Sequence, residues 1–494
     1  MKKPILLCIA LLVGAFVSGC TDSAPSGPTP GLGSLSVKKY VSIGNSLTAG
    51  YQSNGLYASA QIYSYPNMIA QQLVKSGAVL DTFQQPLYSD PGIPDPATGK
   101  AQRYEIISFA NPNSPVIGPK GLTPGAPTNS ALPRPYDNLG IPGIVTAHFL
   151  DTTNNVGNVP NGLVPLVLRY GAGSPFPKSI YKHVQALAAN PATTPDIVTF
   201  WLGNNDVLGF ATSGGAKPTA PTGSATFAFL YKQALDSLRK TLPNAKIIVA
   251  TIPDVKAVPF FTTLGPKIAA AIGGAYFKYQ KHGGVGALSV DSTTFKEATP
   301  PLITLKGSAY VGFIGRPSFQ VWRDLGVTYA QLQPAGLDST APFGLSNKNP
   351  WPDAYVLDPP EQGTAGQAAT DFNSSIQAAA TADNAMVFDS YGFFNSVKAN
   401  GYSIAGEVYT ADYISGGLFS LDGVHPSSRG YAIIANQFIS VMNSKYGTSI
   451  PYVDISKIPG IPMPLGKYAA GSKIAPSISL DAWKSFDALW GSGF

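Results

Sequence analysis

Short apolar runs predict four β-strands that are widely separated along the chain. Residues 39–43 alternate towards a strand, and residues 197–202 and 246–252 are continuous apolar runs of the length typical of buried strands. A shorter run at residues 386–388 predicts a fourth strand. The first two runs lead directly into turn-forming residues, which places loops at their carboxyl ends.

Apolar side chains recur at helical spacing between and after these runs. Residues 67–75, 225–240, 372–382 and 426–446 each favour a helix, the last with apolar positions along one face. Alternation of strands and helices along a chain is typical of a parallel sheet covered on both faces. The expected fold class is therefore α/β.

Long segments without clear periodicity separate these elements. Segments 52–134 and 259–367 are rich in Pro, Gly and aromatic residues. The chain has 494 residues, more than the roughly 250–300 at which a single core usually stops growing. We interpret the two segments as insertions into one domain at residues 37–446, which a C-terminal extension follows at residues 447–494.

The amino-terminal residues resemble a bacterial lipoprotein signal. Two lysines precede the apolar stretch 5–17, and small residues then lead to Cys20. This stretch is too short for a comfortable membrane span. The resemblance implies a signal peptide at residues 1–19, a lipid on Cys20, a flexible tether at residues 20–36, and location in the cell envelope, at the outer membrane of a Gram-negative bacterium. An ordinary cleaved signal peptide is the alternative.

Composition narrows the classes of partner and cofactor. The net charge is +6, but Lys and Arg form no run, so we expect no nucleic-acid partner. Both cysteines lie within the first twenty residues, and no two of the four histidines are spaced four residues apart. We therefore expect no metal and no cofactor, and we infer no obligate protein partner.

Four short motifs follow one another along the chain: Gly-Asn-Ser-Leu at residues 44–47, Asn-Leu-Gly-Ile-Pro-Gly at 138–143, Gly-Asn-Asn-Asp at 203–206 and Asp-Gly-Val-His at 422–425. In this order they resemble the four blocks of the SGNH, or GDSL, hydrolases, which cleave esters. The resemblance implies a flavodoxin-like three-layer α/β/α fold with a mostly parallel central sheet and, as catalytic residues, Ser46, Asp422 and His425.

The chemistry of these three side chains fits that implication. A serine hydroxyl needs a base within hydrogen-bond reach and a group that orients the base. Asp422 lies three residues before His425, so its carboxylate can accept the proton of one ring nitrogen and leave the other for Ser46. Ser46 follows a predicted strand, where open parallel sheets bind ligands. Its alternative role is a helix cap.

The resemblance also implies three donors for the negatively charged oxygen of the tetrahedral intermediate. They are the backbone N–H groups of Ser46 and Gly143 and the side-chain amide of Asn205. An ordinary loop role is the alternative for Gly143, and a turn role, or replacement by Asn204, is the alternative for Asn205. The family usually has Asp in the first block where this chain has Asn45.

The nature of the substrate is less strongly indicated. The apolar run 266–277 predicts a hydrophobic wall over the acyl side of the pocket, with a buried packing helix as the alternative. The leading hypothesis is a membrane-anchored serine esterase or lipase that acts on acyl esters. The alternatives are a carbohydrate O-acetylesterase of the cell envelope, with a groove lined by Trp and Tyr, and a non-catalytic surface binding lipoprotein.

Overall fold

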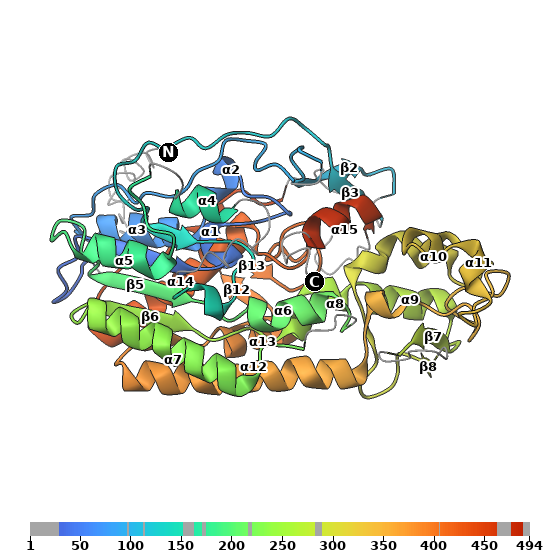
Figure 1. The fold of residues 1–494 in the computed structure, drawn as a ribbon. Helices are drawn as coiled ribbons and strands as arrows, with labels where there is room; N and C mark the ends of the chain where they lie inside the picture. The colour runs from blue at the N-terminus through green and yellow to red at the C-terminus, as the bar shows by residue number, and fades with distance from the viewer. Residues whose placement is uncertain are drawn as a thin grey trace, which may run out of the picture.

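A central five-stranded sheet organises the computed structural model of the chain (Figure 1). Its strands, all parallel, have the order β11-β6-β5-β1-β4. They span Tyr40–Gly44 (β1), Asn138–Gly140 (β4), Ile197–Trp201 (β5), Lys246–Ala250 (β6) and Met386–Phe388 (β11). The structure describes residues 29–95, 98–111, 114–151, 163–169, 174–215, 220–281, 289–404, 406–461 and 476–487.

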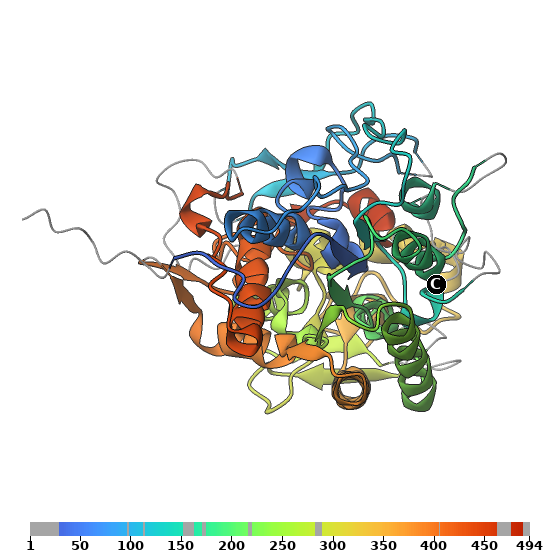
Figure 2. The same ribbon diagram turned by 90° about the vertical axis from the view of Figure 1, so that its left-hand side faces the viewer.

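Helices cover both faces of this sheet, which makes the fold a three-layer α/β/α arrangement. Figure 2 shows α3 (Tyr65–Lys75) and α14 (Ser428–Tyr446) packed together on one side. The other side carries α5 (Ile180–Ala188), α7 (Ser224–Thr241) and α12 (Pro359–Ala382). The expected fold class is confirmed, and the four strands expected from apolar runs are all present in the sheet.

Helices α12 and α14 begin at residues other than the expected 372 and 426, and in both cases a capping side chain is the reason. Helix α12 begins at Pro359, well before residue 372, because Asp358 and Glu361 form a capping box around a proline in the first turn. Helix α14 begins after Ser427, whose hydroxyl accepts from the N–H of Gly430. Residues 359–367 thus belong to a core helix and not to an insertion.

The two long segments contain short elements of their own. Segment 52–134 carries α2 (Ala58–Gln61), β2 (Tyr104–Ser108) and β3 (Val116–Pro119), and β3 also pairs with β14 (Ser477–Ile478) near the carboxyl terminus. The helix α15 (Leu480–Asp487) follows β14 and lies beside β2 and β3 in Figure 1. Much of the second segment forms the lobe at the right of Figure 1. Its elements are α8 (Pro259–Thr262), α9 (Leu264–Ile272), β7 (Phe277–Gln280), β8 (Val290–Thr293), β9 (Leu302–Ile303), α10 (Gln320–Asp324), α11 (Tyr329–Leu332) and β10 (Val356–Leu357).

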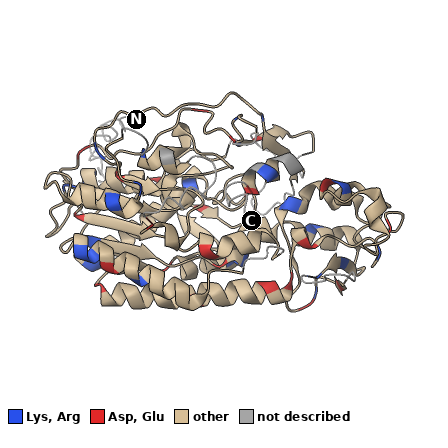
Figure 3. Ribbon diagram, viewed as in Figure 1, with Lys and Arg blue, Asp and Glu red and all other residues tan. Residues whose placement is uncertain are grey.

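The remaining elements are mostly short. They are α1 (Ser46–Ala49), α4 (Leu163–Leu168), α6 (Asn205–Thr212), α13 (Ser390–Asn400), β12 (Tyr402–Ile404), β13 (Glu407–Tyr409) and the 3₁₀ helices η1 (Thr146–His148), η4 (Val255–Ala257), η5 (Leu305–Phe313), η6 (Asp353–Tyr355) and η7 (Ile455–Lys457). Figure 3 shows Lys and Arg spread over the fold with Asp and Glu among them. Within the described residues, no helix has both the length and the apolar character needed to cross a bilayer.

Candidate active site

Three of the four sequence motifs, those at residues 44–47, 138–143 and 203–206, lie at the carboxyl ends of β1, β4 and β5. Ser46 follows β1 and begins α1, while Asn205 follows β5 and begins α6. The helix cap at α1 is Asn45, whose side-chain oxygen accepts from the N–H of Leu47 at 3.0 Å. The alternative role for Ser46, a cap, is thus performed by its neighbour. The Ser46 hydroxyl remains available for a contact across the sheet edge.

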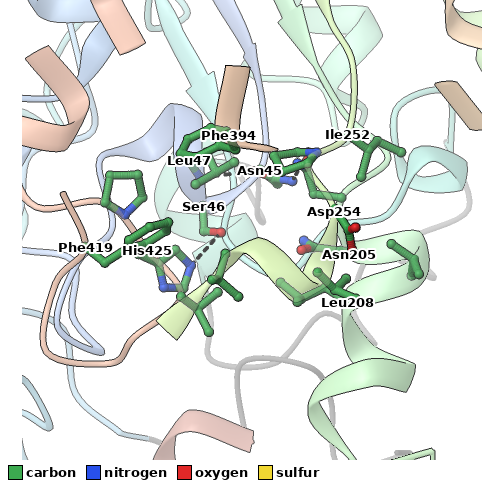
Figure 4. Close-up of a pocket in the computed structure, with 17 residues that line it drawn as sticks. Asn45, Ser46, Leu47, Asn205, Leu208, Ile252, Asp254, Phe394, Phe419 and His425 are labelled. Carbon is green, nitrogen blue, oxygen red and sulfur yellow. Dashed lines mark hydrogen bonds between the residues drawn. The ribbon is translucent and has the colours of Figure 1, made fainter. Parts of the chain in front are cut away.

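Ser46, His425 and Asp422 form a hydrogen-bonded chain. The Ser46 Oγ lies 2.9 Å from the Nε2 of His425 (Figure 4). The Nδ1 of His425 lies 3.0 Å from the Oδ2 of Asp422. All three residues are buried, with 2% or less of each exposed. The structure therefore brings together a hydroxyl and an imidazole that are 379 positions apart in the sequence.

The Asp422 carboxylate has a complete set of donors. Its Oδ1 accepts from the backbone N–H groups of Val424 and His425 at 2.9 and 2.8 Å. Its Oδ2 accepts from the backbone N–H of Asn54 at 3.0 Å in addition to the imidazole. Burial raises the pKa of Asp422, but the neighbouring His425 and these hydrogen bonds outweigh it and hold the pKa below its usual range. The group is consequently ionised at neutral pH.

Two residues that sequence reasoning missed complete the surroundings of the imidazole. The ring of Tyr51 packs against His425 with 4.8 Å between centroids, and its hydroxyl donates to the Asn54 side chain at 3.1 Å. Tyr51 lies directly before, and Asn54 at the beginning of, the segment 52–134 interpreted as an insertion. The Ser-Asn-Gly sequence at residues 53–55 is a turn signal, but it does not say what the turn contacts.

The loops after β4 and β5 are joined through Asn205. Its amide nitrogen donates to the backbone oxygen of Ile144 at 2.8 Å, directly after Gly143. An amide nitrogen has a second hydrogen to donate, and Figure 4 shows the amide end of Asn205 on the side facing Ser46. Gly143 has a φ of 83°, a backbone conformation that favours glycine. Gly143 is not among the residues that line the cavity beside Ser46.

The amide at position 45 has a structural explanation. Asn45 accepts from Leu47 through its oxygen and donates through its nitrogen to the side-chain oxygen of Asn204 at 3.1 Å. An ionised carboxylate can only accept hydrogen bonds. Asn45 therefore links the β1 and β5 loops by a donor that aspartate lacks, and Asn204 serves this link while Asn205 contacts the β4 loop.

Asp206 connects the loop after β5 to the segment after β4 and to the residues before α7. Its carboxylate accepts from the N–H and hydroxyl of Thr146 and from the hydroxyl of Thr222, each at 2.9 Å. Burial raises its pKa to about 6 even though these hydrogen bonds act in the opposite direction. With all of these donors engaged in the loop, Asp206 has a structural role.

A small cavity of about 60 Å³ opens beside Ser46 and His425. Most of its wall is apolar, and one carboxylate, that of Asp254, also lines it. Figure 4 shows this wall around the Ser46 hydroxyl. The apolar lining residues are Leu47, Val207, Leu208, Ile252, Pro253, Val255, Val258, Phe394, Phe419, Val424 and Pro426.

The wall expected from residues 266–277 is wrong for this cavity, because none of those residues line it. Most of them belong to α9 and β7, and α9 buries Leu264 and Ile268 against α8, β9 and η5. The alternative, a buried packing helix, holds only in part, because among residues 266–277 only Ile268 and Phe277 are buried. The cavity is instead lined by the loop directly after β6, together with residues from α13 and the loop before α14.

The other candidate residues lie away from this cavity. His148 accepts from the N–H of Val145, and the Nε2 of His183 lies 2.8 Å from the backbone oxygen of Pro177. Cys20, the signal peptide and His282 lie outside the described residues. In the part of the chain that the structure describes, no three His, Cys, Asp or Glu side chains are grouped so that they could hold a metal ion.

A comparison with family models supports the fourth motif. Residues 319–438, which include Asp422 and His425, match the family model of the GDSL-like lipases/acylhydrolases. No match was found among curated proteins.

The fold is similar to several solved structures of low sequence identity. An α/β hydrolase, LAE5, from the metagenome of Lake Arreo is 11% identical, with a TM-score of 0.32 over 83% of this chain and 97% of that one. A putative GDSL-like lipase of Parabacteroides merdae is 13% identical, with a TM-score of 0.32 over 83% and 99%. An extracellular lipase of Streptomyces rimosus is 14% identical, with a TM-score of 0.30 over 82% and 99%. The likeness of this chain to the GDSL-like lipases/acylhydrolases therefore rests on residues 319–438 and on the four ordered motifs.

Proposed function

We propose that the protein is a serine esterase in which Ser46 attacks the carbonyl carbon of an acyl ester. The observation that carries this proposal is the 2.9 Å contact between Ser46 Oγ and His425 Nε2, with Asp422 on the other ring nitrogen. His425 accepts the proton of the hydroxyl as the carbon–oxygen bond forms, and then donates it to the departing alcohol. Water repeats the sequence on the acyl-enzyme and releases the acid. Asp422 orients the imidazole and stabilises its charged form throughout.

The negative charge on the substrate oxygen needs donors fixed in place before the reaction. We assign this role to the N–H groups of Ser46 and Gly143 and to the Asn205 amide. The Asn205 side chain is held by its bond to Ile144 and lines the cavity beside Ser46. Substitution of Asn205 should therefore raise the free energy of the transition state more than it weakens substrate binding.

Asn205→Ala tests this assignment. We expect kcat to fall by about 10²- to 10³-fold with a small change in KM, because the donor acts on charge that develops in the transition state. Steady-state kinetics on p-nitrophenyl acetate measure both constants. Asn204→Ala, which removes the bond to Asn45, is the matched control, and an equal loss in both variants would assign Asn205 a purely structural role.

The size of the cavity favours short acyl groups. A volume of about 60 Å³ is far below the roughly 300–1,000 Å³ of pockets that enclose drug-sized ligands, and the Asp254 carboxylate on its wall disfavours a long hydrocarbon tail. The substrate class we propose is thus a short-chain carboxylic ester. An O-acetylesterase remains the second candidate because acetyl is the smallest acyl group that fits. Neither Trp nor Tyr is among the residues that line the cavity.

An acyl-chain profile tests this preference. We expect kcat/KM on p-nitrophenyl esters to be highest for acetate or butyrate and to fall by about tenfold or more towards palmitate, since added methylenes have no space in the cavity. The Ser46→Ala variant supplies the background rate for each ester. A maximum at long chains would reject the short-chain proposal and favour a lipase.

We also propose that Cys20 anchors the enzyme to the cell envelope through a lipid. The support is the sequence alone: a basic start, a short apolar stretch and small residues before the cysteine. Because attached fatty chains account for the membrane affinity, we expect Cys20→Ser to move the protein from the membrane fraction to the soluble fraction of the host, as followed by immunoblot. Unchanged membrane association would contradict the anchor.

A further inference from the structure

The carboxylate of Asp422 depends on a backbone turn with an unusual conformation. Gln52 and Gly55 exchange backbone hydrogen bonds across this turn, and its two central residues, Ser53 and Asn54, have φ values of 50° and 54°. Such left-handed conformations of non-glycine residues persist only when the surroundings hold them. The N–H that Asn54 directs at Asp422 is thus only as well placed as the turn that carries it.

Tyr104, the first residue of β2, holds this turn from outside. Its N–H donates to the backbone oxygen of Ser53 at 2.7 Å. Its own ring is buried, and its hydroxyl donates to the backbone oxygen of Ala482 in α15 at 2.6 Å. Tyr104 therefore connects α15 to the turn that supports Asp422.

A second connection reaches the Asp422–His425 loop itself. The backbone oxygen of Gly423 accepts from the N–H of Phe260 at 2.9 Å. The ring of Phe260 packs against Trp483 and Phe486 of α15, with centroid distances of 5.5 and 5.7 Å. Trp483 also meets the ring of Tyr104 edge-on at 5.9 Å. Trp483 thus contacts both Tyr104, which holds the turn at residues 52–55, and Phe260, which contacts the Asp422–His425 loop.

Helix α15 is itself fixed at both of its ends. Before the helix, Ile478 in β14 donates to the hydroxyl of Ser308 at 3.2 Å, and β14 pairs with β3. In the last turn, Asp487 forms an ion pair with Lys306 at 2.5 Å. Both Ser308 and Lys306 lie in η5, so β14 and the last turn of α15 are attached to the same 3₁₀ helix.

From these contacts we propose that Trp483 of α15 is a positioning residue for the Asp422–His425 loop, acting through Tyr104 and Phe260. The proposal rests on the proposed function of Ser46, His425 and Asp422 and goes beyond it by giving the C-terminal extension a part in the reaction. Trp483 touches neither Ser46 nor His425, so it acts by keeping the carboxylate and imidazole in register. Small displacements of such groups reduce turnover strongly.

Two variants of the full-length protein test the proposal. Trp483→Ala removes the ring that joins the two connections, and Tyr104→Phe removes only the hydroxyl that donates to Ala482. On p-nitrophenyl acetate we expect kcat to fall by about 10- to 100-fold in the first and by about threefold in the second, with KM within about twofold of the wild type. Trp483→Phe, which keeps an aromatic ring between Tyr104 and Phe260, should restore most of the lost kcat.

Tyr181→Phe is the matched control for loss of stability. It also removes a tyrosine hydroxyl that donates to a backbone oxygen, that of Ser237, but between α5 and α7 and not near the loop. Its kcat should be unchanged even if its melting temperature falls as much as that of Tyr104→Phe. Wild-type kcat in Trp483→Ala, or equal losses of kcat in Tyr104→Phe and Tyr181→Phe, would overturn the proposal. If the Ser46→Ala variant keeps the wild-type activity, the proposed function itself fails, so the two failures are distinguishable.

Discussion

Replacing Ser46 by alanine is expected to lower kcat/KM on p-nitrophenyl acetate by about 10⁴-fold or more, since the acyl-enzyme cannot form without the hydroxyl. The change removes one oxygen atom from a buried side chain whose hydroxyl contacts His425. Asn45 caps α1 in its place, so the fold should be preserved. Initial rates at several enzyme concentrations measure the loss, and thermal unfolding shows whether the variant is folded.

The matched control for this substitution is Ser374→Ala. Ser374 is an exposed serine in α12, and its hydroxyl donates to the backbone oxygen of Thr370 in the same helix. We expect full activity and full labelling by a fluorophosphonate probe in this variant, and neither in Ser46→Ala. Labelling of a folded Ser46→Ala protein at the wild-type rate would assign the nucleophile to another residue.

The sheet could be predicted largely because its strands are locally encoded. The runs that became β5 and β6 are apolar except for Thr199 in the first and Lys246 at the start of the second, as is typical of strands covered on both faces. β4 spans only Asn138–Gly140 and begins with a polar residue, so it carries no such pattern. Its place at the sheet edge depends on pairing with β1, which no local pattern shows.

The residues of the candidate site could likewise be predicted only in part. The Asp422–His425 pair is encoded by a spacing of three residues, and the order of the motifs placed Ser46 beside it. The support from Asn54 depends on a hydrogen bond between residues 368 positions apart, with no motif to announce it. The apolar run at 266–277 misled because hydrophobicity alone does not say which cavity, or which neighbouring helix, a segment covers.

Asp422→Asn is the second substitution for which we expect a very large effect, a fall in kcat of about 10³- to 10⁴-fold. The amide can still accept from Asn54 or from the backbone of His425. However, an amide nitrogen facing Nδ1 favours the tautomer whose proton is on Nε2, and an Nε2 that carries a proton cannot accept the one from Ser46. Because the pKa of Asp422 is held below its usual range, the wild-type carboxylate is ionised throughout the neutral region, and the loss should be seen at every pH there.

A comparison with Asp454→Asn separates this effect from a general loss of charge. Asp454 caps η7 at the surface, where its carboxylate contacts Ser456 and Lys457, so its variant should have wild-type kcat. If Asp422→Asn keeps more than about a tenth of the wild-type kcat, the carboxylate does not set the tautomer, and the imidazole must be oriented by its other contact, the ring of Tyr51. A rise in KM with an unchanged kcat would instead mean that Asp422 acts on substrate binding. Its position behind the imidazole argues against that.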